Sequence, residues 1–189
     1  MNSTHFFSHN VTTIIKNPAL IFFVISAVGY ATNKKPDVKL GLFNAKLKYE
    51  IKGSTVTIFE CDKKESRALI IPAVIEGKPV TSIRDNAFAG CHNITSIIIP
   101  ATVTKIGNTA FIDCFRLRSI TIPDSVTNIG DGAFYQCTNL TALTFLGDAP
   151  EIANDAFEKS SPTIYREAAA KGWGDTLAGR PVKLITEKP

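Results

Sequence analysis

Apolar residues return along this chain at a fixed interval of 23 positions. The interval is clearest in a motif where Ala-Phe is followed by cysteine or serine: "NAFAGC", "TAFIDC", "GAFYQC" and "DAFEKS". Five apolar columns keep the same register, and two of them are Phe88, Phe111, Phe134 and Phe157, and Ile83, Ile106, Ile129 and Ile152. A unit this short cannot bury its own apolar side chains and has to stack on its neighbours. The pattern predicts a repeat solenoid over residues 70–160.

Each repeat is typical of a strand followed by a corner and a short helical turn. In "LRSITIP", Ile120 and Ile122 alternate with Ser119 and Thr121, which indicates a strand with one face toward the core. The proline that follows ends the strand because it cannot donate to a sheet ladder. The next segment, "DSVTNIGDG", predicts corners, since glycine supplies backbone freedom. "AFYQCTNL" then predicts a helical turn, so we expect an α+β repeat solenoid.

Both open ends of a solenoid need a cover, and the flanking sequences predict one at each end. Before the repeats, "AKLKYEIKGSTVTIFE" alternates apolar and polar residues on both sides of a Gly-Ser turn, which predicts a β-hairpin cap over residues 44–69. After them, residues 161–189 predict a C-terminal cap with a short strand, a brief helix over Glu167–Lys171 and a closing strand over Val182–Ile185. Trp173 is expected to pack within this cap, with an exposed, ligand-stacking position as the alternative.

The first 31 residues differ from the rest of the chain. They contain no acidic residue, Lys16 is their one basic residue, and an apolar run covers Ala19–Ala31. This composition and a small-x-small exit predict a signal peptide over residues 1–31. The run is shorter than the roughly 20 residues that span a bilayer, but an uncleaved anchor and a buried hydrophobic helix stay open as alternatives. Residues 32–43 are expected to form a linker.

Three of the four cysteines occupy the same place in successive repeats, and only Cys61 lies outside this series. Equivalent side chains in neighbouring coils project in parallel, which suits small buried thiols better than a disulfide. We therefore expect a reduced, buried column, with a disulfide among the cysteines as the alternative. The cysteines have no histidine companions at zinc-site spacing, so no metal site is expected. The column is Cys91, Cys114 and Cys137.

The repeat units closely resemble a known family. "IPATVTKIGNTAFIDCFRLRSITIP" and "IPDSVTNIGDGAFYQCTNLTALTF" are similar to the BspA-type (Treponema pallidum type) leucine-rich repeats over about Ile70–Phe157. The resemblance implies a short, right-handed leucine-rich-repeat solenoid with a curved strand face. It also implies a secreted or surface-exposed protein of a bacterium or parasitic protist that acts in adhesion and protein binding. It implies no catalytic residues.

The sequence carries little that resembles an active site. His92 is the one histidine that remains once the predicted signal peptide is removed, and it follows Cys91 directly. Neighbours on a helical turn point about 100° apart, so we do not expect the two to act as a catalytic pair. Dinucleotide, phosphate-loop and nucleophile-elbow motifs are absent. With these motifs absent, no cofactor is expected. The net charge of +4 is small and the basic residues are scattered, so no nucleic acid partner is expected.

The outward strand positions are the remaining candidates for a binding site, because the strand sheet is the usual binding face of such solenoids. We expect a secreted or cell-surface protein that binds a protein ligand or mediates adhesion and has no catalytic activity. Membrane contact is expected only through an uncleaved N-terminal segment. The alternative is a structural scaffold that self-associates or is anchored by that segment. The predicted binding residues are Ile70, Ser96, Ile98, Ser119, Thr121, Ala142 and Thr144.

Overall fold

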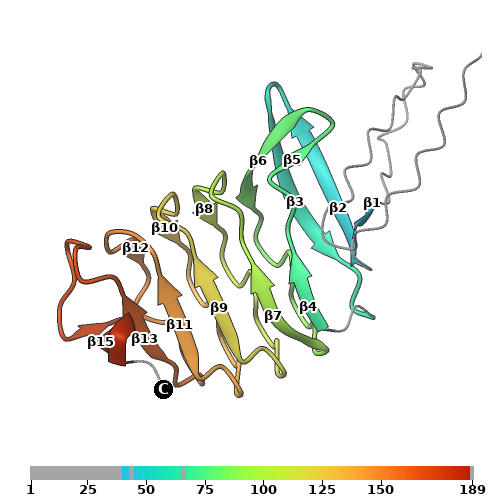
Figure 1. Cartoon of the computed structure of the whole chain (residues 1–189). Coiled ribbons are helices and arrows are strands. Elements are labelled where there is room, and N and C mark those ends of the chain that lie inside the picture. Colours follow the sequence, from blue (N-terminus) through green and yellow to red (C-terminus); the bar gives the residue numbers. More distant parts are fainter. Residues whose placement is uncertain (1–39, 43–44, 65–66, 188–189) are drawn as a thin grey trace, which may run out of the picture. The chain divides into compact units, whose positions relative to one another are not determined.

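The computed structural model describes residues 40–42, 45–64 and 67–187, and the repeats within these ranges form a β-solenoid (Figure 1). Successive coils lie side by side in chain order, and each repeat adds strands to two sheets. The predicted signal peptide over residues 1–31 lies outside the described residues. Within the described ranges, no helix has the length and apolar character needed to span a bilayer.

The first sheet continues from the N-terminal hairpin into the corner strands of the repeats. Its strands from β6 onward pair in parallel, with the predicted isoleucine column in register. The order is β1 (Leu40–Leu42), β2 (Ala45–Lys52), β3 (Thr55–Cys61), β6 (Lys78–Ile83), β8 (Lys105–Ile106), β10 (Asn128–Ile129) and β12 (Glu151–Ile152), with β5 (Val74–Ile75) paired to β6.

The second sheet contains the predicted repeat strands and continues beyond them. All of its pairs are parallel except that of β14 with β15. We call the side of this sheet that faces away from the core the strand face. The order is β14 (Thr176–Leu177), β15 (Arg180–Leu184), β13 (Thr163–Arg166), β11 (Ala142–Phe145), β9 (Ser119–Ile122), β7 (Ile94–Ile98) and β4 (Arg67–Ile70).

The side of each coil that carries the Ala-Phe motif consists of turns and extended chain. The Phe88 N–H donates to Ala110 O of the next coil at 2.8 Å, and Phe111 and Phe134 repeat this bond at the same distance. In an α-helix these N–H groups would instead bond four residues back in their own segment. The one helical element in the described residues is a 3-10 turn, η1 (Ile185–Glu187). The α+β prediction is therefore wrong, and the solenoid is built from strands and turns.

The glycines at the second corner serve two different purposes. Gly132 has a φ of +57°, a left-handed conformation that glycine adopts without strain. Gly130 is required by space, because a Cβ at this position would lie only 2.7 Å from Asn108 N in the preceding coil. The sequence prediction of backbone freedom holds for Gly132, while close approach of neighbouring coils explains Gly130.

The core is a stack of aromatic rings along the solenoid axis. Neighbouring rings have centroids 5.1, 5.3 and 5.6 Å apart and interplanar angles of at most 16°. Each ring is at most 1% exposed, which confirms the predicted apolar column. Burying large aromatic side chains is the main favourable contribution of such a stack. The rings belong to Phe88, Phe111, Phe134 and Phe157.

All four cysteines of the chain are buried and form no disulfide, so the disulfide alternative is not realised in the structure. Cys114 Sγ donates to Phe88 O of the preceding coil at 3.2 Å. Ser160 Oγ makes the equivalent bond to Phe134 O at 2.6 Å. Serine can therefore replace cysteine in the last repeat, because both side chains are small and can donate to this buried carbonyl. The column consists of Cys91, Cys114, Cys137 and Ser160.

At the N-terminal end, β2 and β3 form the expected antiparallel hairpin, and β3 continues in parallel onto β6. The Tyr49 hydroxyl at the hairpin donates to Glu76 Oε1 of the first repeat at 2.7 Å. The segment 32–43 is not only a linker, since Leu40–Leu42 forms β1 and pairs with β2. The cap therefore extends further toward the N-terminus than the apolar alternation of residues 44–69 indicates.

At the C-terminal end, the expected helix over Glu167–Lys171 is absent. Its backbone bonds to the preceding coil instead: the Lys171 N–H donates to Asp148 Oδ1 at 2.6 Å, and the Ala149 N–H donates to Lys171 O at 2.9 Å. Trp173 packs within the cap as predicted, with its ring centroid 5.0 Å from that of Phe145. The cap is therefore one more partial coil laid against the last repeat.

Candidate functional site

The predicted binding residues lie on one sheet and form two rows that run across the strands. The register aligns Ser96 of β7 with Ser119 of β9 and Ala142 of β11. The second row aligns Ile70, Ile98, Thr121 and Thr144 of β4, β7, β9 and β11. Alternation along each strand turns the residues between these rows toward the core. The sheet thus brings all seven predicted residues onto the strand face.

These residues differ in how far they reach solvent. Ile98 is 53% exposed and Ile70 is 40% exposed, and Thr121 is exposed as well. Thr144 is only 7% exposed, so the prediction that it is available to a partner is wrong. It lies in register with Tyr165 of β13, a larger side chain that is itself buried. The open part of the strand face is therefore its N-terminal half. Ser96, Ser119 and Ala142 are partly exposed.

Sequence reasoning predicted a short strand and a closing strand in the C-terminal cap, but not that they pair with the repeat strands and extend this sheet. Thr163 and Tyr165 of β13 continue the two rows, and Lys183 of β15 is in register with Tyr165. The repeat period hides them, because Thr163 follows its partner Ala142 after 21 positions instead of 23. The alternation in "TIYR" was the available signal. Lys183 is exposed and adds a positive charge to this end of the face.

Three of the four large exposed apolar residues in the described part of the chain belong to the first coils, and the fourth, Leu146, follows β11. Ile70 and Ile98 are in register, and the Ile71 N–H donates to Ile98 O at 3.1 Å. Val74, four residues after Ile70, is 54% exposed. In β9, the next strand of the sheet, the residue in register with Ile98 is Thr121. We call Ile70 and Ile98 the apolar patch, and large exposed side chains of this kind are typical of surfaces that contact other proteins.

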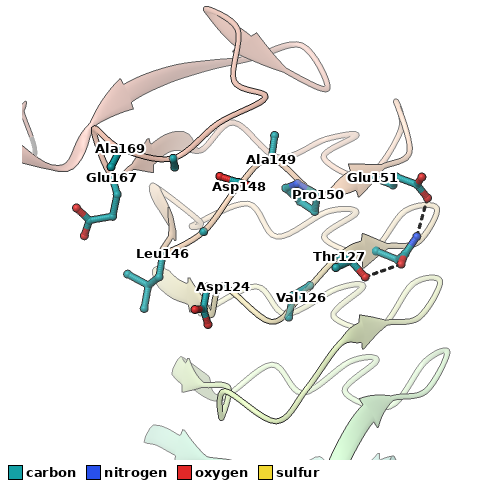
Figure 2. Close-up of a pocket in the computed structure, with 13 residues that line it drawn as sticks. Asp124, Val126, Thr127, Leu146, Asp148, Ala149, Pro150, Glu151, Glu167 and Ala169 are labelled. Atoms are coloured by element: carbon teal, nitrogen blue, oxygen red, sulfur yellow. Dashed lines mark hydrogen bonds between the residues drawn. The ribbon is translucent and has the colours of Figure 1, made fainter.

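A groove of about 990 Å³ lies at the corner between the last repeats and the C-terminal cap (Figure 2). Thr127 and Glu151 lie toward one end of the view, and Leu146 and Glu167 toward the other. Two of the carboxylates are already used, since Asp148 accepts the Lys171 N–H and Glu151 accepts from Asn128 Nδ2 at 2.7 Å. No lysine or arginine lines the groove, so its chemistry favours a positively charged group. Its acidic residues are Asp124, Asp148, Glu151 and Glu167.

The Cys91 and His92 pair is not assembled for catalysis. Cys91 is 1% exposed in the core, whereas His92 is exposed on the surface. The His92 ring stacks on Phe115 with centroids 4.8 Å apart, and its Nδ1 lies 2.8 Å from Asp113 O. The described residues also contain no group of three or more His, Cys, Asp or Glu side chains placed to hold a metal ion. The pair therefore has structural roles on opposite sides of the backbone.

Comparison with known proteins gives matches to repeat proteins of bacteria. A comparison with curated proteins finds no significant match. A leucine-rich repeat protein from Bacteroides capillosus is 28% identical, with a TM-score of 0.55, and the match covers 65% of this chain and 94% of that one. A leucine rich cell surface protein from Faecalibacterium prausnitzii is also 28% identical, with a TM-score of 0.52, covering 73% of this chain and 41% of that one. This chain thus corresponds to less than half of the second protein.

A further solved structure, the T. pallidum leucine rich repeat protein, is 23% identical with a TM-score of 0.46, covering 63% of this chain and 68% of that one. The sequence model of the BspA type leucine rich repeat region matches residues 68–166 in six copies. This match spans more than half of the 189 residues and includes the phenylalanine stack and the strand face. The chain is a member of the BspA-type leucine-rich repeat family.

Proposed function

We propose that this protein is exported and binds another protein, in adhesion or surface attachment, through the N-terminal half of its strand face. Leucine-rich repeats generally mediate protein–protein interactions, and proteins of this repeat family are generally non-catalytic. The similar protein from Faecalibacterium prausnitzii is described as a cell surface protein. The predicted signal peptide over residues 1–31 supports export of this chain.

The observation that carries the proposal is the exposure of two large aliphatic residues on the last two strands at the N-terminal edge of the strand face. Ile98 and Ile70 stand in adjacent strands, with exposed Thr121 beside Ile98. Removing such side chains from water contributes favourably to binding, at about 25 cal/mol per Å² of apolar surface. The surrounding serine and alanine residues are small, so a partner can approach the sheet closely.

The open half of the face is small compared with a standard protein–protein interface. A stable interface usually involves about 20–30 residues on each side. The predicted face has seven residues, and Thr144 is buried. We therefore expect a single copy to bind weakly, and several copies on one surface to raise the apparent affinity. Adhesion is a function that suits weak contacts repeated many times.

Two matched substitutions test the position of the binding surface. Thr121 and Thr127 are both exposed threonines, the first on the strand face and the second in the acidic groove. A partner captured from extracellular proteins by the full chain is measured against Thr121→Glu and Thr127→Glu. We expect Thr121→Glu to weaken binding by about tenfold or more, because a carboxylate must be desolvated. Thr127→Glu should change binding by less than about twofold. The reverse order would place binding in the groove.

Export is tested separately by the mature N-terminus. Mass spectrometry of the native protein is expected to show a mature chain that begins after Ala31, the predicted cleavage site. A native chain that keeps residues 1–31 would favour the alternative, a solenoid anchored by its first segment. The other alternative, a self-associating scaffold, is tested by sedimentation of the purified protein. A scaffold of this kind requires a sedimenting mass that increases with protein concentration.

A further inference from the structure

Two cysteines meet where the hairpin cap joins the first repeat. Cys61 is the last residue of β3, and Cys91 begins the column of small buried side chains. The Cys61 N–H donates to Ala87 O at 2.9 Å, which fixes the end of β3 beside the Ala-Phe segment that leads to Cys91. The two side chains are 2% and 1% exposed, and both belong to the core that continues from the cap into the first repeat. Two buried thiols from separate structural units therefore lie close together where the cap joins the repeats.

The other two cysteines of the column are arranged differently. Cys114 Sγ donates to Phe88 O at 3.2 Å, and Cys137 Sγ donates to Phe111 O at 3.0 Å. They occupy equivalent positions in parallel coils, so their Cα–Cβ directions run parallel instead of converging as a disulfide requires. Hydrogen bonding with Cys137 and burial raise the pKa of the Cys114 thiol, which makes it a poor nucleophile. Cys61 belongs to the hairpin and is not held to this parallel arrangement.

The surroundings of Cys91 lower the pKa of its thiol. The hydrogen bond with Cys61 has the largest effect and the positive charge of Lys63 acts in the same direction, against burial and the negative charges of Asp62 and Glu60. Lys63 Nζ lies 3.6 Å from the position that a Cβ on Gly90 would occupy, so the ammonium group is next to the residue that precedes Cys91. A thiolate beside a second thiol is the arrangement from which disulfides form by exchange.

We propose that Cys61 and Cys91 are a disulfide-forming pair that fastens the hairpin cap to the first repeat, with a small-molecule disulfide as the oxidant. The Cys91 thiolate attacks one sulfur of the oxidant, forming a mixed disulfide and releasing one thiolate. Cys61 then loses its proton and its sulfur attacks the Cys91 sulfur, which closes the Cys61–Cys91 bond and releases the second thiolate. The two protein thiols are oxidised, and one oxidant disulfide is reduced to two thiols.

The oxidised form is expected to resist unfolding more strongly than the reduced form. The bond would close the chain between Cys61 and Cys91, and it would hold the cap on the sheet that continues into β6. Because both sulfurs are buried, oxidation requires the cap to open or the chain to be folding. We expect the bond to form efficiently during refolding and slowly in the folded protein.

Peptide mapping tests the pairing directly, because each cysteine lies in a different tryptic peptide. The full chain is denatured with reductant, refolded in a buffer of reduced and oxidised glutathione, alkylated and digested. We expect a disulfide-linked pair made of peptides 53–63 and 85–105, while peptides 106–116 and 119–159 carry alkylated cysteines. Recovery of all four cysteines as alkylated thiols overturns the proposal, and so does a link between 106–116 and 119–159.

A stability measurement with a matched control tests the same bond independently. Oxidised wild-type protein is expected to unfold at least about 5 °C above the same protein kept in reductant. Cys61→Ser should abolish this difference, whereas Cys137→Ser should retain it, because each variant is compared with itself in the two buffers. A difference that survives Cys61→Ser, or is lost in Cys137→Ser, contradicts the assignment of the pair.

Discussion

The two ends of the solenoid are closed in different ways. At the N-terminal end, the hairpin extends the first sheet, and β4 of the second sheet has β7 as its one strand neighbour in the described residues. At the C-terminal end, the second sheet is extended by β13, β15 and β14, while β12 is the last described strand of the first sheet. Each cap therefore protects a different sheet. In the described residues, no cap strand pairs with the second sheet at β4, whereas cap strands extend this sheet beyond β11.

This difference matches the position of two exposed apolar side chains on the strand face. Ile70 and Ile98 stand near the uncovered edge of the strand face. Toward the other end, Thr144 and Tyr165 in the same row are each only 7% exposed. An open sheet edge beside large aliphatic residues is a surface that proteins usually cover or use. The comparison therefore assigns binding to the N-terminal end and structural closure to the C-terminal end.

The largest expected effect lies between the two ends, in the phenylalanine stack. Phe111 is fully buried, and its ring stacks on both Phe88 and Phe134. Phe111→Ala is expected to lower the free energy of unfolding by about 3–5 kcal/mol, because it removes apolar contacts and leaves a cavity. Urea unfolding followed by tryptophan fluorescence measures the change. A loss below about 1 kcal/mol would show that both caps, and not the shared core, supply the stability.

At the C-terminal end, Arg180 bonds to the carbonyl of Phe157, the last residue of the stack, which also accepts from the Ser160 N–H at 2.9 Å. Its guanidinium donates to Phe157 O at 2.8 Å. Arg180→Ala is expected to cost about 1–3 kcal/mol, since it removes a hydrogen bond from a charged donor and leaves a carbonyl without it. Lys183→Ala, an exposed change in the same strand, is the control and should stay within about 0.5 kcal/mol. Equal effects in thermal unfolding would mean that Arg180 does not close this end.

At the N-terminal end, Tyr49 is the comparable closing residue. Tyr49→Phe removes its hydrogen bond to Glu76 and is expected to cost about 0.5–1.5 kcal/mol. Burial, followed by the bond to Glu76, raises the pKa of the Tyr49 hydroxyl above its usual value of 10.0. The folded protein therefore holds this proton more tightly than the unfolded chain, and stability should fall as pH rises above about 10.

Denaturant unfolding of wild type and Tyr49→Phe at several pH values measures this loss. The other titrating groups are shared by both proteins, so they cancel in the difference. The stabilities of the two proteins should converge as pH rises through this alkaline range. A constant difference between them would mean that the hydroxyl is not buried at the cap.

The smallest expected effect concerns the last position of the cysteine column. Ser160→Cys restores the repeat residue and should change stability by less than about 1 kcal/mol, because sulfur can also donate to Phe134 O. Ser160→Ala should cost about 1–3 kcal/mol, because it removes two buried hydrogen bonds, the one to Phe134 O and the one from the Cys137 N–H to Ser160 Oγ at 2.8 Å. If the cysteine variant is as unstable as the alanine variant, the column is held by size alone.

Sequence periodicity was sufficient for the solenoid, its core columns and the hairpin, because these depend on side chains that repeat or alternate locally. It was misleading for the Ala-Phe segment. Phenylalanine and cysteine three residues apart suit a helix and a turn equally well, and the bond that decides between them runs from Phe88 to Ala110 in the next coil. Pairing between coils is invisible to a pattern read within one repeat.

The candidate site was predictable in its position but not in its extent. Alternation placed the seven residues on one face, yet exposure depends on what stands beside each residue. Thr144 is buried although it alternates correctly, and it is in register with the larger Tyr165. That neighbour was missed because the last coil is shorter by two positions, which moves β13 out of the 23-residue register.

Backbone hydrogen bonds join neighbouring coils in both sheets and along the Ala-Phe segment, and the described repeats contain no helix. A through-hydrogen-bond NMR coupling between the Phe111 amide nitrogen and its acceptor carbonyl tests this most directly. The structure predicts a coupling to the carbonyl carbon of Ala133 in the next coil, where the bond is 2.8 Å long. A coupling to Gly107, four residues back, would show an α-helix and contradict the account.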